Sequence, residues 1–205
     1  GPATLLYGSG AIGGVVNVID NRIPEKVTEQ IVLEQKYNTV SNNRQTAFKF
    51  DGGKSKFAYH FDGYFQKSDD LEVGGDAIDV TRANVSQPSL DIGDNTSGFV
   101  KNTEADNLSL TAGGSFVGDS GFFGVSANVV DMEYQIPVRG EVGGEESNIE
   151  MEQRKLDIKG GLKNLNGFFS KMDAKLSFTD YEHTEALEAL FQNDTFEGRM
   201  DATHK

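Results

Sequence analysis

The chain has 205 residues and a formal net charge of −13, with 24 glycines, 14 phenylalanines and no cysteine. Nucleic acid is a poor partner for so acidic a chain, because phosphate neutralisation needs clustered Lys and Arg. The lack of cysteine excludes disulfides and thiolate metal sites, and no run of about 18 apolar residues is present to form a transmembrane helix. A barrel strand needs only about 10 residues with alternate ones apolar, so the composition is compatible with a β-barrel.

The first 20 residues, GPATLLYGSGAIGGVVNVID, differ from the rest. They carry five glycines and end in the apolar run of residues 15–19, and a short β-branched run predicts a strand buried on both faces. The glycines fit a tight turn before that strand or a phosphate-binding loop, and the lack of a G-x-x-x-x-G-K-[ST] motif favours the turn. Residues 21–24 mark a boundary.

Beyond this boundary, alternating apolar and polar residues predict strands at 27–39, 45–51, 55–66, 105–116, 122–133, 150–162 and 168–181, with another beginning at Thr195. We expect one parity to form an outer apolar face and the other a polar inner face. The expected outer residues are Phe57, Tyr59, Phe61, Phe123, Val125, Leu176 and Phe178. The expected inner residues are Lys56, His60, Asp62, Asn128, Lys171, Asp173 and Lys175.

Connection lengths predict how these strands are arranged. Tight turns are expected at 52–54, 118–121 and 164–167, and long polar loops at 67–104, 135–148 and 182–194. Sorting of this kind is typical of an outer-membrane barrel, with short periplasmic turns and longer extracellular loops. Seven strands and part of an eighth do not close such a barrel, so we expect the chain to be a piece of a longer protein.

Residues 1–24 resemble the end of the plug domain of TonB-dependent outer-membrane receptors. Those plugs commonly end in G-P-x-x-x-L-Y-G-x-x-A-x-G-G-V-[VI]-N-[VI], which is carried here by residues 1–2, 6–8, 11 and 13–18. The segments MEYQIP, DIKG, DYEHTE and NVIDNRIP give a more diffuse resemblance to the zinc-uptake branch.

The resemblance implies an all-β fold: the last strand of a plug domain at residues 1–24, then about seven or eight strands of an antiparallel transmembrane β-barrel at residues 25–205, out of roughly 22. It implies import of a scarce metal, as zinc or as an iron or other metal chelate, across the outer membrane of a Gram-negative bacterium. The partners would be the TonB protein, the metal or chelate ligand and outer-membrane lipid. The chain would be no enzyme and hold no resident cofactor.

The candidate metal ligands are His183 and Glu185, because imidazole and carboxylate together suit zinc and related metals. Two ligands make half a site, which other residues would complete; the alternative is a solvated loop histidine among acids. Members of the zinc branch often carry a His-rich loop after the MEYQIP-like segment. This chain has residues 138–149 there, with three glutamates and no histidine, which argues against zinc.

Two further groups have less specific signals. His60 beside Asp62 is expected to be a satisfied polar residue of the inner face. The acids of the longest loop could offer oxygen ligands to Ca²⁺, but their spacing does not match D-x-[DN]-x-[DN]-G, which favours an uncoordinated acidic loop. These acids are Asp69, Asp70, Glu72, Asp76 and Asp79.

One alternative to a receptor is a secreted or surface-exposed structural or adhesive β protein, which should show a fixed repeat; the expected strand starts do not. An outer-membrane barrel enzyme would need a nucleophile paired with a histidine or an Asp–His pair, and none is visible. A passive porin would lack the plug-like segment.

Overall fold

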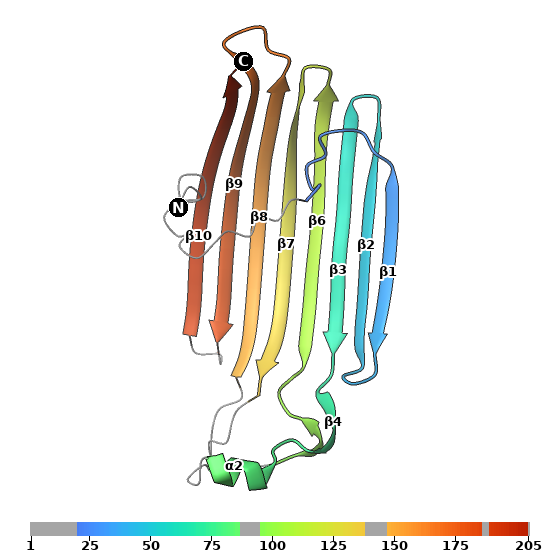
Figure 1. Ribbon diagram of the computed structural model, residues 1–205, viewed down its shortest axis with the longest axis vertical. Coiled ribbons are helices and arrows are strands. Elements are labelled where there is room, and N and C mark those ends of the chain that lie inside the picture. The colour runs from blue at the N-terminus through green and yellow to red at the C-terminus, as the bar shows by residue number, and fades with distance from the viewer. Residues whose placement is uncertain (1–19, 87–94, 138–146, 186–188, 205) are drawn as a thin grey trace.

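The computed structural model describes residues 20–86, 95–137, 147–185 and 189–204, and these form an all-β structure built on one large antiparallel sheet (Figure 1). Its eight strands are β1 (Gln30–Asn38), β2 (Asn43–Lys54), β3 (Phe57–Ser68), β6 (Ala105–Gly118), β7 (Gly121–Ile136), β8 (Ser147–Lys163), β9 (Phe169–Glu185) and β10 (Ala189–His204). They follow one another in chain order across the sheet, which confirms the expected antiparallel meander.

A small arm interrupts the meander between β3 and β6. It contains β4 (Leu71–Asp76), the short helix α2 (Val80–Ser86) and β5 (Ser97–Val100), with β4 paired to β5. Backbone hydrogen bonds from Asp69 and Glu72 to the β1–β2 turn hold its base. The loop expected at 67–104 is therefore partly structured. Within the described part of the chain, no helix is long and apolar enough to cross a membrane.

The third long loop expected, at 182–194, is wrong. Strand β9 runs to Glu185 and β10 begins at Ala189, with Glu182 paired to Gln192 and Asp180 to Asp194. The many polar residues of this segment predicted a loop. Charged side chains also occur in strands, however, where the strand is paired on both edges or where the side chains face water. The β1–β2 turn at the same end of the sheet is also short, so connection length is not sorted strictly by end.

The turn between β2 and β3 lies at residues 55–56, because the expected turn residues Gly52 and Gly53 belong to β2. Ser55 takes the positive φ of 58° that this two-residue turn requires. Lys56 therefore lies in the turn, and its Nζ is 5.8 Å from the ring centroid of Phe116. The expectation that Lys56 faces inward is wrong.

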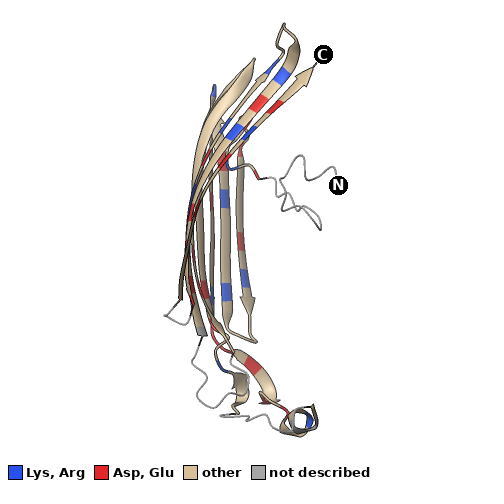
Figure 2. Cartoon of the chain, turned by 90° about the vertical axis from the view of Figure 1, so that its left-hand side faces the viewer, with Lys and Arg blue, Asp and Glu red and all other residues tan. Residues whose placement is uncertain are grey.

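The sheet is curved (Figure 2), and its two faces differ in chemistry. The convex face carries the expected apolar parity; Phe57, for example, is 66% exposed. The concave face carries the polar parity, which includes the buried residues His60 and Asn128. Apart from Lys56, each residue assigned above to the outer or inner face has the expected strand parity.

Aromatic rings cover glycines on the convex face. A Cβ added to Gly63 would lie 2.5 Å from the ring of its cross-strand neighbour Phe48, and one added to Gly52 would overlap Tyr59. Each ring thus lies flat over a position without a side chain. These contacts explain how an aromatic face can be close-packed along a single layer of strands.

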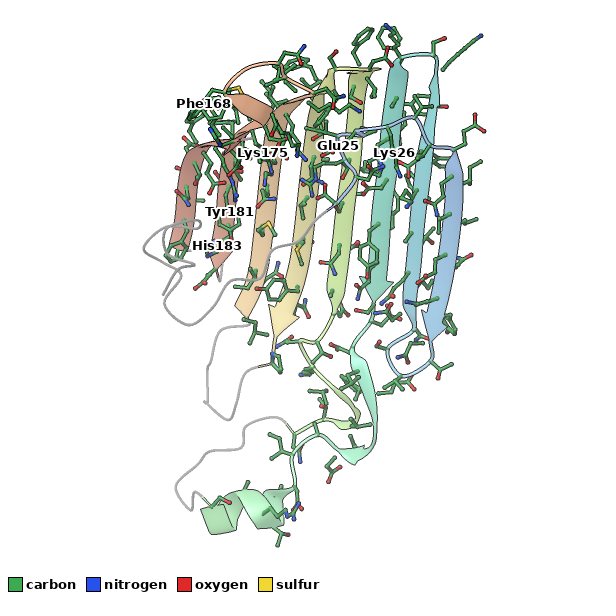
Figure 3. The ribbon with its side chains drawn as sticks, turned by 45° about the horizontal axis from the view of Figure 1, so that its top comes forward. Glu25, Lys26, Phe168, Lys175, Tyr181 and His183 are labelled. Carbon is green, nitrogen blue, oxygen red and sulfur yellow. The ribbon has the colours of Figure 1, made fainter. Side chains whose placement is uncertain are left out.

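Residues 20–27, here called the strap, lie across the concave face before the chain enters β1. The strap lies against β6 and β7 and reaches β2 at Val27, and its polar side chains extend to β8 and β2 on either side. Its Glu25 and Lys26 lie over the sheet in Figure 3. The prediction that residues 15–19 form a separate buried element falls outside the described residues.

Candidate functional site

The concave face is the candidate site, because its described side chains are polar, convergent and mostly satisfied. Its buried polar residues come from β2, β3, β6, β7, β8 and β9, since alternate residues of each strand project to this side. They are Asp51, His60, Ser68, Thr111, Ser115, Ser126, Asn128, Asp157 and Ser177. Three groups on this face contain histidine or clustered charge.

The first group is centred on His60, which is 4% exposed. Its Nδ1 lies 2.6 Å from Asp51 and its Nε2 2.6 Å from Asp62. A neutral imidazole has one N–H donor, so hydrogen bonds to both carboxylates require a second proton in the group. Lys49 lies 3.6 Å from Asp51, and Asn21 of the strap donates to the same carboxylate. His60 is therefore a satisfied polar residue of the concave face, as expected.

The second group is centred on Asp157 of β8, whose side chain is 2% exposed. It accepts a hydrogen bond of 2.7 Å from Ser177 and lies 3.3 Å from Lys175 and 3.6 Å from Arg22 of the strap. Arg22 also binds Asp20 at 2.7 Å. A buried carboxylate is stable only when paired and hydrogen-bonded, and here donors from β9 and from the strap meet that need.

The third group lies on β9 and β10 near the end of the sheet that carries the arm, where Figure 3 shows Tyr181 and His183 along one strand. The His183 ring stacks on Phe191 at 4.6 Å and meets Tyr181 edge-on at 5.5 Å. Its Nε2 is 3.4 Å from Glu185, and its Nδ1 is buried without a hydrogen-bond partner. The structure thus brings the two predicted metal ligands together inside an aromatic cluster.

The histidine groups differ in what they offer a metal ion. In the first, the two carboxylates contact opposite nitrogens of the His60 ring, so the three groups cannot share one ion. In the third, a free nitrogen and one carboxylate give two ligands, whereas zinc takes four. Among the residues that the structure describes, no set of three or more His, Asp or Glu side chains is arranged to hold a metal ion.

The acids of the arm serve its own folding. Asp70 accepts hydrogen bonds from the backbone and hydroxyl of Thr103, and Asp69 accepts one from Asn42. Asp79 accepts from the backbone N–H of Arg82 and caps the start of α2. These contacts favour the reading of an uncoordinated acidic loop.

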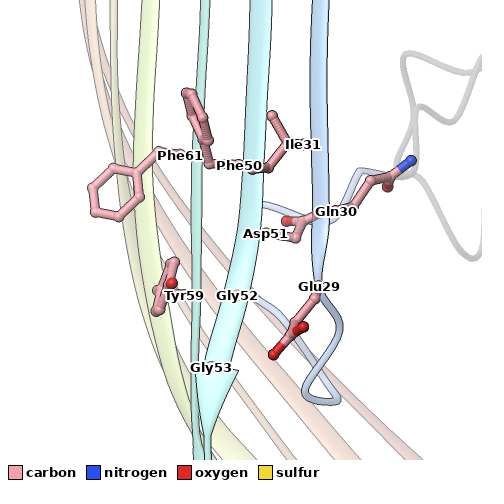
Figure 4. Close-up of a pocket in the computed structure, with 9 residues that line it drawn as sticks. All are labelled: Glu29, Gln30, Ile31, Phe50, Asp51, Gly52, Gly53, Tyr59 and Phe61. Carbon is pink, nitrogen blue, oxygen red and sulfur yellow. The ribbon is translucent and has the colours of Figure 1, made fainter.

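A hollow of about 590 Å³ lies where β1 begins beside β2 and β3 (Figure 4). It is lined by Phe50 and Tyr59 of the convex face and by Asp51 of the concave face. Residues from both faces can line one hollow only around the edge of the sheet, and β1 is an edge strand. The hollow is therefore a feature of the sheet edge; it shares Asp51 with the first group and lies apart from the other two.

Sequence reasoning missed the Asp157 group and the strap. The signal for Asp157 is its position on the polar parity of a strand whose other parity is apolar. Its partners come from residues 22, 175 and 177, so only the register of β8 with β9 and the path of the strap bring them together. No protein-family model matches the chain.

Proposed function

We propose that this chain is part of a TonB-dependent outer-membrane receptor: the end of its plug domain and the first strands of its transmembrane barrel. The receptor imports a scarce metal, as zinc or as a metal chelate. The observation that carries the proposal is the apolar band of the convex face together with its slant across the sheet.

The band has a charged border toward the arm end of the strands. On the convex parity, apolar residues give way to charged ones within two positions, as Phe65 does to Lys67 and Leu156 to Arg154. The border is formed by Lys67, Asp131, Arg154, Asp180 and Asp194. A face with an apolar belt, exposed aromatics and a charged edge fits contact with lipid and then with headgroups or water.

The border slants relative to the hydrogen-bond register. Phe65 is in register with Glu152 of β8 and with Gln192 of β10. On these two strands the belt begins at Leu156 and Phe196, each four residues further from the arm, and on β10 an isolated Leu190 lies on the arm side of the border. Four residues are roughly 13 Å along a strand, over three steps of about 4.8 Å to β8 and five to β10. Between β3 and β8 the border therefore crosses the strands at a tilt of about 40°, within the 35–45° of membrane barrels. From β8 to β10 it runs level, because Arg154, Asp180 and Asp194 are in register.

The concave face supports the transport part of the proposal. It is polar and carries a chain segment from the N-terminal side, as the lumen of a plugged barrel would. The His183 group lies on this face near the arm end, where an external ligand would arrive first. A secreted structural or adhesive protein would have no need of a slanted apolar belt.

The test is uptake by cells that carry the full-length receptor, with and without a working TonB protein. Zinc and an iron chelate are supplied separately as the radioactive metal. We expect TonB-dependent accumulation of one of the two, and loss of it when the receptor gene is deleted. If the deletion strain accumulates both metals as fast as the strain that carries the receptor, the transport function is rejected. Recovery of the protein in the secreted fraction would support the structural alternative.

A further inference from the structure

The strap lies in a shallow track of small residues on the concave face, here called the seat: Gly53 of β2, Gly113 and Ser115 of β6, and Gly124 of β7. A Cβ on Gly113 would overlap the carbonyl oxygen of Arg22. A Cβ on Gly124 would lie 2.6 Å from Ile23, and one on Gly53 would lie 2.9 Å from Val27. A larger side chain at Gly113 would therefore displace the backbone of the strap, whereas one at Gly53 or Gly124 would press on the strand backbone as well as on the strap.

The strap is buried where it crosses the seat. Ile23 is 6% exposed, and Pro24 is among the most fully buried side chains of the described residues. Ser115 donates a hydrogen bond to the carbonyl oxygen of Pro24. Since the sheet is a single layer, these contacts are a large part of what is buried on its concave side.

Charged and polar side chains pin the strap on both sides of this apolar contact. Arg22 binds Asp157, and Glu25 binds Lys159 of the same strand. Asn21 reaches Asp51 on β2, at the other side of the seat. The pins lie on β2 and β8, so the strap is held across the strands between them.

We infer that the seat is a binding surface dedicated to the strap, and that the strap stays bound to it while the receptor works. This limits the movement of the plug, a consequence that rests on the proposed function. A force applied to the chain before residue 20 is resisted at Arg22 and does not displace the strap. The strap is then part of the barrel wall, and the ligand path opens elsewhere.

These 205 residues contain no cysteine, so a single thiol reports on the seat once any cysteine elsewhere in the full-length receptor is replaced by serine. Ser115 is 6% exposed beneath Pro24, and Ser115→Cys places a thiol of nearly the same size there. The rate of its reaction with a maleimide is measured in the full-length receptor in outer-membrane vesicles. We expect Gly113→Ala to raise this rate about ten-fold or more, because it opens the protected site.

The matched control is Gly114→Ala, the same change at the next residue of β6. Gly114 faces the convex side, and its added Cβ would meet only the carbonyl oxygen of Ala58, at 3.6 Å. The rate should stay within about two-fold of the unaltered receptor. Equal rates for the two glycine variants would overturn the seat.

A second pair of variants changes the strap and leaves the sheet untouched. Ile23→Asp should raise the Ser115→Cys rate as Gly113→Ala does, while Lys26→Asp, at an exposed strap position, should not. Equal rates for these two variants would also contradict the binding of the strap to the seat.

In cells, the labelling rate of Ser115→Cys should be the same with and without TonB. A TonB-dependent rise in this rate would contradict the proposal that the strap stays bound. Failure of the uptake experiment would leave the comparison of the variants intact.

Discussion

The two faces of the sheet are made by the same strands but are stabilised in different ways. On the convex face, aromatic rings lie over glycines and over one another, as Phe48 does over Gly63, and the surface is left apolar. On the concave face, hydrogen bonds and ion pairs satisfy buried polar groups such as Asp157 and His60. The comparison teaches that, among the described residues, the face that no other segment of the chain covers is the apolar one, and such a surface is costly in water.

The sharpest way to break this comparison is to place a charge in the apolar belt. If the proposed function holds, Phe61→Lys should destabilise the folded protein in lipid vesicles by about 2–4 kcal/mol, because a lysine near the centre of the belt must leave water. The free energy is measured by urea unfolding. Tyr64→Lys, on the concave face of the same strand, is the control and should cost clearly less. Equal losses would contradict a lipid-facing belt.

Loss of the buried carboxylate tests the concave face. Asp157→Ala should cost about 1–3 kcal/mol, because Ser177 loses its acceptor and Lys175 and Arg22 lose a shared anion. The same unfolding measurement applies. Asp173→Ala removes a carboxylate that is paired with Lys171 at the surface, and should change stability by less than about 0.5 kcal/mol. A smaller loss for Asp157 than for Asp173 would show that the buried network adds nothing.

Overpacking tests the rings that cover glycines. Gly63→Ala puts a Cβ 2.5 Å from Phe48 and 2.9 Å from Leu110, so these side chains must move. The expected cost is about 1–2 kcal/mol of unfolding free energy. Gly114→Ala, also on the convex face but in open contact, should be close to neutral. A neutral Gly63→Ala would mean that the rings shift without penalty.

The smallest expected effect on folding comes from His183. Since its ring stacks on Phe191, His183→Ala should cost about 0.5–1.5 kcal/mol. If the receptor takes up zinc through this group, zinc affinity measured by calorimetry should fall about ten-fold or more. His204→Ala is the control, because His204 also packs on an aromatic ring, that of Phe168, away from Glu185. Unchanged zinc affinity for His183→Ala would remove this histidine from the site.

The sequence by itself determined the strands and their faces. Alternation from Phe57 to Phe65 is a period of two, and a strand turns every second side chain to the same side whatever surrounds it. It also placed His183 two residues from Glu185 on one parity. It did not locate the end of β9, because the acids and Thr184 there have no local preference strong enough to show that they pair with β10.

Only the tertiary structure decided which residues meet across the concave face. Arg22 and Asp157 are 135 residues apart, and no local pattern links them. Gly113 is one small residue within an alternating strand, and only the path of the strap shows that no side chain fits there. The physical reason is that periodicity fixes the direction of each side chain, whereas long-range contacts depend on strand register and on the path of the chain between elements.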